Sequence, residues 1–267
     1  MITKLKKKIT KKYYKTVYKN RVVIDDYRDL HLLLAPENHV DRRLKAKQPY
    51  ENEQIDFVLT QIRLKSVDWF IDVGANIGLY SLLVAKNSQQ IKKVFAIEAQ
   101  VENYNQLCGN IFLNKFDRII HPINIGASDR KNKTTFLRNM GNSTGTSRIQ
   151  ETAPSTTKFH RFEEDSIVVD TLDSIISKQY AAEQDLGSDN SPKDVHNKNL
   201  FFKIDVEGHE LNVLKGMREL LSNNHCILQI EILYEVEETS QQICENFGLE
   251  KIHQIGSDNY FETKVSA

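Results

Sequence analysis

One stretch in the first half of the chain combines acids and glycines at a spacing that suits ligand binding. Asp72 is followed by Gly74, Asn76 and Gly78, and Glu98 lies twenty residues beyond Gly78. Glycines permit a tight turn out of a strand and a close approach of the next helix to the sheet. The first N–H groups of that helix can bind a carboxylate, and an acid at a strand end can accept hydrogen bonds from ribose hydroxyls. These five residues predict a site for a nucleoside that carries an amino acid, with Asp72 holding its amino group.

A dinucleotide such as NAD is the main competing ligand for this arrangement. Its fingerprint is G-x-G-x-x-G, whereas this chain has Asn76 and Leu79 where the second and third glycines would stand. A ligand without a diphosphate has no need of those glycines, so the pattern favours a single nucleoside. The chain also has no G-x-x-x-x-G-K-[ST] loop, which argues against phosphate chemistry.

A second polar block, Asp205–Glu210, follows another apolar run. Ligands of open α/β sheets bind beyond the carboxyl ends of the strands, so this block is expected beside the glycine loop. Asp205 could hold the amino group of the ligand or orient a second substrate, the acceptor of a transferred group. His209 is either the catalytic base, since its unperturbed pKa lies near neutrality, or a surface residue that opens a helix. Glu207 and Glu210 either bind the acceptor or stabilise a helix N-terminus.

The elements that must position these residues alternate between short apolar runs and helical patterns from Phe70 onward. This alternation is typical of an α/β sheet covered by helices on both faces. We predict strands at 69–73, 94–97, 119–125, 201–206 and 227–232, and an antiparallel pair near 249–265. Pro122 indicates that the third strand either lies toward an edge or pairs irregularly. The predicted fold is a doubly wound, mostly parallel, seven-stranded sheet closed by a C-terminal antiparallel hairpin.

Composition shifts along the chain predict its organisation. Residues 1–48 form a basic extension and lead-in, and residues 49–267 form the catalytic domain. A polar insertion lies near 179–199, and the polar loop 141–147 is a candidate lid over an acceptor. Residues 1–21 carry nine lysines and arginines and no acid. Ile2, Leu5, Ile9, Tyr13 and Val17 lie among them at helical spacing, which predicts either peripheral contact with an anionic membrane or a frayed terminus.

The overall composition is that of an ordinary globular protein, with 267 residues, 40% hydrophobic and 27% charged. No apolar run approaches the roughly 20 residues needed to span a bilayer. We expect a cytoplasmic location, with peripheral contact at the membrane as the alternative. The three cysteines form no CxxC pair, which argues against a disulfide framework and a zinc site. We therefore expect no metal site, although a divalent cation on Asp205, Glu207 and Glu231 is an alternative. No nucleic-acid partner is expected, because the chain beyond residue 21 is net acidic and carries no known binding motif.

Four blocks of the chain, taken in order, resemble the FkbM-type methyltransferases, a branch of the class I S-adenosylmethionine-dependent enzymes. The blocks are 70–78, 96–98, 171–173 and 203–210. The last is the most specific, because generic class I enzymes lack its Lys-x-Asp-x-Glu-Gly-x-Glu pattern. Tyr50-Glu51 is similar to the family's aromatic–acid pair, whereas Ala99 departs from its usual proline. The resemblance runs from about Tyr50 to Glu231.

This resemblance implies a seven-stranded sheet with a reversed final hairpin and S-adenosylmethionine as the cofactor. It implies O-methyl transfer, in several members to hydroxyls of sugars or natural products, and it places Ser128 or Asp129 beside the adenine. We therefore expect a methyltransferase whose partner is a small-molecule or glycan acceptor. The alternatives are a protein that binds the cofactor but has no active acceptor site, and an NAD-type enzyme.

Overall fold

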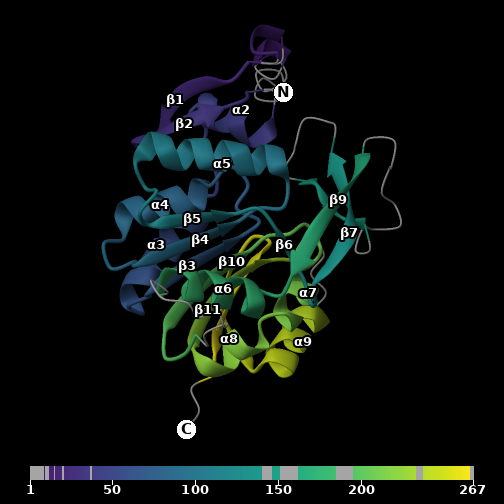
Figure 1. Ribbon diagram of the computed structural model, residues 1–267. Coiled ribbons are helices and arrows are strands. Elements are labelled where there is room, and N and C mark those ends of the chain that lie inside the picture. The colour runs from purple at the N-terminus through teal and green to yellow at the C-terminus, as the bar shows by residue number, and fades with distance from the viewer. Residues whose placement is uncertain are drawn as a thin grey trace.

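The computed structural model describes residues 9, 12–14, 16–19, 21–36, 38–139, 146–150, 162–184, 195–232 and 237–264. A seven-stranded sheet forms its centre (Figure 1). In spatial order its strands are β12 (Leu249–Ile255), β13 (Asp258–Thr263), β11 (His225–Glu231), β10 (Asn199–Ile204), β3 (Trp69–Val73), β4 (Lys93–Ile97) and β5 (Ile120–Ile123).

The central sheet is mixed. The five strands β11, β10, β3, β4 and β5 pair in parallel, whereas β13 is antiparallel to β11 and β12 is antiparallel to β13. The expectation of a mostly parallel sheet therefore holds only within those five strands. The reason is the length of the connections: only Gly256 and Ser257 separate β12 from β13, and so short a link permits only an antiparallel pair. Strand β5, which contains Pro122, lies at the edge.

Helices cover both faces of this sheet (Figure 1). Because side chains alternate along a strand, Phe70 and Phe201 pack with one layer while Ile71 and Phe202 pack with the other. The first layer contains α3 (Asn52–Leu64), α4 (Leu79–Asn87) and α5 (Val101–Asn114). The second contains α6 (Leu172–Gln184), α7 (Glu210–Lys215), α8 (Arg218–Asn223) and α9 (Glu237–Phe247). All five residues of β3 are buried, which identifies it as a central strand.

A second sheet, which the sequence patterns did not predict, stands beside the carboxyl ends of the central strands (Figure 1). Its strands are, in order, β6 (Gly126–Ala127), β9 (Phe162–Asp170), β7 (Asn132–Asn139) and β8 (Arg148–Ile149). The single strand expected at 119–125 is wrong at its end, because β5 stops at Ile123 and the chain then enters β6 of the second sheet. Strand β7 buries only Phe136 and Leu137, and the first part of β9 is largely exposed, so their apolar signal is weak.

The N-terminal part contains a hairpin of β1 (Val23–Tyr27) and β2 (Leu30–Leu34), followed by α2 (His39–Lys45). It packs on α5, where the Leu33 N–H donates to Asn110 Oδ1 at 2.7 Å and Gln106 Nε2 donates to the Leu33 carbonyl at 2.8 Å.

Several predicted features fall at the margin of the described residues. Of the amphipathic stripe, Ile9, Tyr13 and Val17 are exposed, and Ile2 and Leu5 lie outside the described part of the chain. Of the loop 141–147, only Thr146 and Ser147 are described. Helix α6 occupies the first residues of the expected insertion, and 185–194 lie outside the description. No described helix is long and apolar enough to cross a membrane.

Candidate functional site

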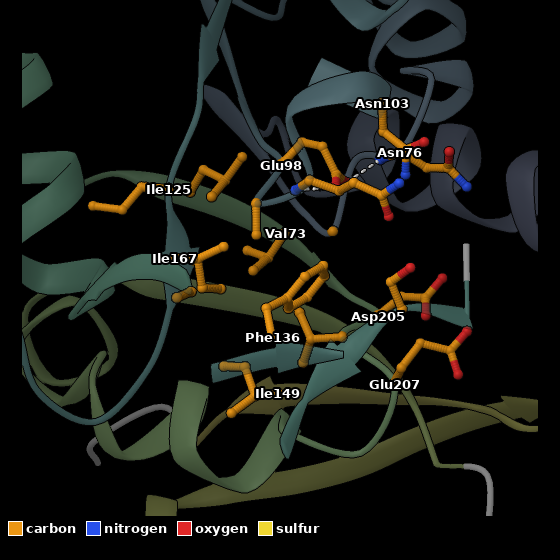
Figure 2. A pocket seen from close by; sticks show the side chains of 18 residues that line it. Val73, Asn76, Glu98, Asn103, Ile125, Phe136, Ile149, Ile167, Asp205 and Glu207 are labelled. Carbon is orange, nitrogen blue, oxygen red and sulfur yellow. Dashed lines mark hydrogen bonds between the residues drawn. The ribbon is translucent and has the colours of Figure 1, made fainter. Parts of the chain in front are cut away.

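A pocket with about 640 Å³ of empty space, part of it open to solvent, lies where β3, β4 and β10 end and the second sheet begins (Figure 2). Five of the residues predicted for the site line it, namely Gly74, Asn76, Glu98, Asp205 and Glu207. The other lining residues are Val73, Ile97, Ala99, Gln100, Asn103, Ile125, Gly126, Ala127, Phe136, Ser147, Ile149, Ile167 and Val206.

Glu98 is held at the end of β4 by backbone donors. Its Oε2 accepts the Asn76 N–H at 2.8 Å and its Oε1 accepts the Gln100 N–H at 2.9 Å. The side chain is only 7% exposed, and this burial raises the pKa of the carboxyl to about 7 despite the two donors. The side chain of Asn103 is a third donor to this carboxyl. Because a carboxylate offers about four lone-pair positions, an ionised Glu98 can still accept a hydrogen bond from a ligand.

The two predicted glycines allow the loop after β3 to take its path. Gly74 has φ +80°, and a Cβ placed there would overlap the backbone carbonyl of Asp205. Gly78 has φ +86°, and its Cβ would overlap the side chain of Leu107 on α5. These positions bring β3 against β10 and α4 against α5, so the loop can pass between them.

Apolar side chains from two sheets form the walls of the pocket. Ile97 and Ile125 come from the rim of the central sheet, and Phe136, Ile149 and Ile167 come from the second sheet (Figure 2). The sequence patterns missed the latter three, because each stands in a strand whose other residues are mostly polar. The signal that could have found one of them is the short apolar run Ile167-Val168-Val169.

All charged residues that line the pocket in the described part of the chain are acidic, namely Glu98, Asp205 and Glu207. A diphosphate would be repelled by such a lining, whereas a cation would be attracted. Figure 2 places the carboxyl groups of Asp205 and Glu207 at one end of the pocket. The pocket therefore has a neutral, apolar part and an acidic part.

Asp72 lies behind this pocket and does not line it. Its side chain is 1% exposed, and its Oδ2 accepts hydrogen bonds from the Ser81 N–H at 3.2 Å and the Ser81 hydroxyl at 2.7 Å. The neighbouring strand places Lys203 directly beside it. Asp72 is thus part of the support of the site, below the ligand-facing layer.

Asp205 is oriented by Lys203, two residues earlier on the same strand. Lys203 Nζ donates to Asp205 Oδ2 at 3.0 Å, and this ammonium group holds the pKa of Asp205 below its usual range although burial opposes it. Glu231, at the end of β11, lies within hydrogen-bonding reach of Asp205. Glu51, the acid of the aromatic–acid pair, also lies near Lys203 and the hydroxyl of Tyr80.

Glu207 stands at the mouth of the acidic part with φ +57°, a left-handed conformation that a residue other than glycine adopts at a cost. Burial and the nearby charge of Asp205 raise its pKa to about 7. Arg148 of β8 lies opposite, with its Nη2 3.8 Å from Glu207 Oε2. This pair connects the second sheet to the rim of the central sheet.

The structure does not bring four further predicted residues to the pocket. His209 is 2% exposed, and its Nε2 lies 2.9 Å from the hydroxyl of Ser128. Asp129 and Ser128 lie with His209 behind the pocket wall, around a smaller cavity. Glu210 Oε1 accepts the N–H groups of Val206 at 3.3 Å and Gly208 at 2.9 Å, so it stabilises the turn before α7. Among the described residues, no three His, Cys, Asp or Glu side chains are grouped to hold a metal ion.

Comparison with known proteins gives two curated relatives of similar length. Hexuronic acid methyltransferase AglP of Haloferax volcanii is 24% identical over 212 residues, which are 79% of this chain and 75% of that protein. Methyltransferase sdnD of Sordaria araneosa is 27% identical over 193 residues, which are 66% of this chain and 71% of that protein.

Among solved structures, methyltransferase FkbM from Methylobacillus flagellatus KT aligns with a TM-score of 0.43 and 20% identity, over 74% of this chain and 43% of that one. The described fold thus spans less than half of that longer chain. Residues 72–255 match the profile of the methyltransferase FkbM domain. Because this match covers well over half of the chain, the protein belongs to the FkbM methyltransferase family.

Proposed function

We infer that the protein transfers a methyl group from S-adenosylmethionine to a hydroxyl group of a sugar or natural product. One observation carries this proposal: the charged lining of the pocket is acidic in the described part of the chain. S-adenosylmethionine carries a sulfonium and an ammonium group, and both cations suit that lining. The diphosphate of NAD does not suit it, which disfavours the dinucleotide alternative.

The residues present fit the parts of this cofactor. Glu98 would accept a hydrogen bond from the ribose hydroxyls at the lone-pair position that Asn76, Gln100 and Asn103 leave free. The apolar walls around Ile125 and Phe136 would enclose the adenine. Gly74 and Asn76 would bring backbone groups to the amino-acid end, and Asp205 would face its positive charges. Bound S-adenosylmethionine supplies an electrophilic methyl group, so the acceptor hydroxyl must lose a proton.

We assign that proton to Asp205 instead of His209. Asp205 lines the pocket and is held ionised by Lys203, whereas His209 is buried against Ser128 outside it. Glu207, at the same end, would bind a neighbouring hydroxyl of the acceptor. The hexuronic acid named for the Haloferax relative supports a sugar acceptor, since a polyol offers several hydroxyls to such carboxylates.

The test is methyl transfer from labelled S-adenosylmethionine into extracts of the source organism, followed by identification of the labelled product. We expect a labelled methyl ether, and a loss of about 10²–10⁴-fold in rate for Asp205→Asn, which is the usual size of a general-base effect. Asp56→Asn is the matched control, because Asp56 is exposed and pairs with Arg28 away from the pocket. Label on nitrogen or carbon, or an unchanged rate in Asp205→Asn, would contradict the proposal.

A further inference from the structure

A column of polar side chains crosses the central sheet beneath the acidic end of the pocket. Register pairs Asp72 with Lys203, Lys203 with Gln229, and Gln229 with Tyr260. Residues two positions apart in a strand share a face, so Asp205, Glu231 and Asp258 extend the same column to the rim. The column lies on the face covered by α3 and α4, as the ammonium of Lys203 5.0 Å above the ring of Tyr80 indicates.

Lys203 is the one cation of this column in the described structure, and it is only 5% exposed. A buried ammonium group is costly unless charged or polar partners surround it. Its Nζ donates to Asp205, and the charges of Asp72 and Glu51 act on it as well. Three carboxyl groups from three different segments thus converge on a single lysine.

Asp205 and Glu231 are neighbours at the ends of adjacent parallel strands. The register pairs Ile204 with Ile230, so the next residue of each strand stands side by side at the rim. Their carboxyl groups are within hydrogen-bonding reach, and two carboxyls so close do not both ionise readily. The contacts differ: Lys203 donates to Asp205, whereas the Ser257 hydroxyl donates to Glu231 Oε1 at 3.1 Å.

Some polar atoms of the column have no hydrogen-bond partner. Within the described residues, Asp72 Oδ1, Gln229 Oε1 and the Tyr260 hydroxyl are buried and have no partner. Buried polar groups in a purely structural network are normally paired. The free positions lie one layer below the rim, where Asp205 faces the pocket.

We propose that Asp205 and Glu231 form a carboxyl pair that holds one proton, and that Lys203 is the positioning residue that keeps the negative charge on Asp205. This inference rests on the proposed function, in which the acceptor hydroxyl gives its proton to Asp205. In that step the O–H bond breaks, the proton forms a bond to a carboxylate oxygen of Asp205, and the electron pair left on the acceptor oxygen would form the bond to the methyl carbon. The methyl–sulfur bond would break at the same time, with its electron pair staying on sulfur. The proton then leaves Asp205 to water.

The electrostatics agree with this division. The charge of Lys203 lowers the pKa of Asp205, and burial together with the charge of Asp205 raises the pKa of Glu231 to about 9. Other ionisable groups near the pair come from every neighbouring element. They are Asp72 (β3), Tyr50 and Glu51 (before α3), Tyr80 (α4), Glu207 and Glu210 (after β10), Arg148 (β8), and Asp258 and Tyr260 (β13).

The test is a pH titration of the full chain by ¹³C NMR, with the side-chain carboxyl carbons of Asp and Glu labelled. Glu231→Gln and Asp205→Asn assign the two resonances. We expect the wild-type pair to titrate in two widely separated steps, the upper one near pH 9. In Lys203→Met the lower step should rise by roughly one to three units, because the opposite charge is gone. Lys65→Met is the matched control, since Lys65 pairs with Glu262 elsewhere on the sheet, and it should leave both steps unchanged.

One further variant and the unmutated chain keep the test decisive if Lys203→Met does not fold. Lys203→Arg keeps the charge and should keep the separation of the steps, and the unmutated chain alone reports the upper step. The proposal is overturned if both carboxyls titrate below pH 6, or if Lys203→Met leaves the lower step in place. Calorimetry with S-adenosylmethionine on the same samples separates the two claims. Separated steps without cofactor binding would remove the proposed function and leave the carboxyl pair standing.

Discussion

Glu98 at the end of β4 and Glu231 at the end of β11 stand at the same rim of one sheet, in different surroundings. Two backbone N–H groups hold Glu98 in place, whereas Glu231 lies beside another carboxyl and accepts from the hydroxyl of Ser257. Backbone donors fix a carboxyl group without fixing its proton, so Glu98 is suited to bind hydroxyls. Two neighbouring carboxyl groups do not both ionise readily, so the pair tends to keep one proton. The rim of β10 and β11 is therefore suited to proton transfer.

The largest effect is expected where these two regions meet, at Gly74. A side chain there would overlap the carbonyl of Asp205 and force β3 away from β10. Gly74→Val should cost about 3–5 kcal/mol of unfolding free energy, in the range of severe overpacking combined with backbone strain. Urea unfolding measures the loss. Gly248→Ala is the control, because Gly248 has a similar φ of +66° but no atom within 4 Å of its Cβ. Equal losses in both variants would show that close packing at Gly74 is unimportant.

Glu98→Gln tests the cofactor side with a smaller change. It keeps the shape of the side chain but removes the negative charge of the carboxylate, which in the proposed function accepts hydrogen bonds from the ribose hydroxyls. Affinity for S-adenosylmethionine should fall by roughly 10–100-fold, as expected for loss of hydrogen bonds to a charged group. Isothermal calorimetry measures the affinity. Glu102→Gln serves as the control, because Glu102 is an exposed residue of the nearby helix α5 and pairs with Arg138 of β7. An affinity equal to that of the wild type would remove Glu98 from the site.

The pH dependence of cofactor binding sharpens the same point. Burial raises the pKa of Glu98 to about 7, so the ionised, accepting form is lost as the pH falls below that value. Affinity should therefore decrease by up to about tenfold per pH unit below 7. Glu207, whose pKa is also about 7, acts in the same direction. Calorimetry between pH 5.5 and pH 8.5 should show a shallower slope in Glu98→Gln, and a slope identical to the wild type would contradict this assignment.

The smallest effect is expected from the second sheet. Phe136→Leu removes part of an apolar wall while keeping an apolar residue, so affinity for S-adenosylmethionine should fall by only a few-fold, corresponding to about 1 kcal/mol or less. Phe116→Leu is a control in another part of the apolar core. A loss as large as that of Glu98→Gln would mean that the second sheet contributes as much to binding as Glu98. The roles assigned to the ends of β4 and β11 would then not explain binding.

The part of the pocket around the glycine loop could be predicted from the sequence because its residues are contiguous. Asp72 to Gly78 is one strand-to-helix turn, and an acid that ends a buried strand must lie at the rim. The apolar runs of β3, β4, β10 and β11 likewise predicted those strands. Thr171-Leu172-Asp173 was recognised as a block, but its role emerges only in three dimensions, where Asp173 accepts the N–H groups of Glu219 and Leu220 at the start of α8.

The rest depends on contacts between distant segments. The pairing of β7 with β9 joins residues 132–139 to 162–170. Both strands are mostly polar, and the apolar run in β9 is only three residues long, Ile167–Val169. The column that joins Asp72 to Lys203 depends on strand register, and the periodicity of a sequence does not predict register. His209 was a candidate base by its chemistry alone. The turn through Gly208, with φ +103°, directs it to Ser128, a direction that residue type cannot reveal.

Calorimetric titration of the pure chain with S-adenosylmethionine and, separately, with NAD tests the central claim most directly. The acidic lining and Glu98 predict binding of S-adenosylmethionine at one site per chain in the micromolar range, and no measurable heat with NAD. Absence of binding to S-adenosylmethionine, or tighter binding of NAD, would contradict the account.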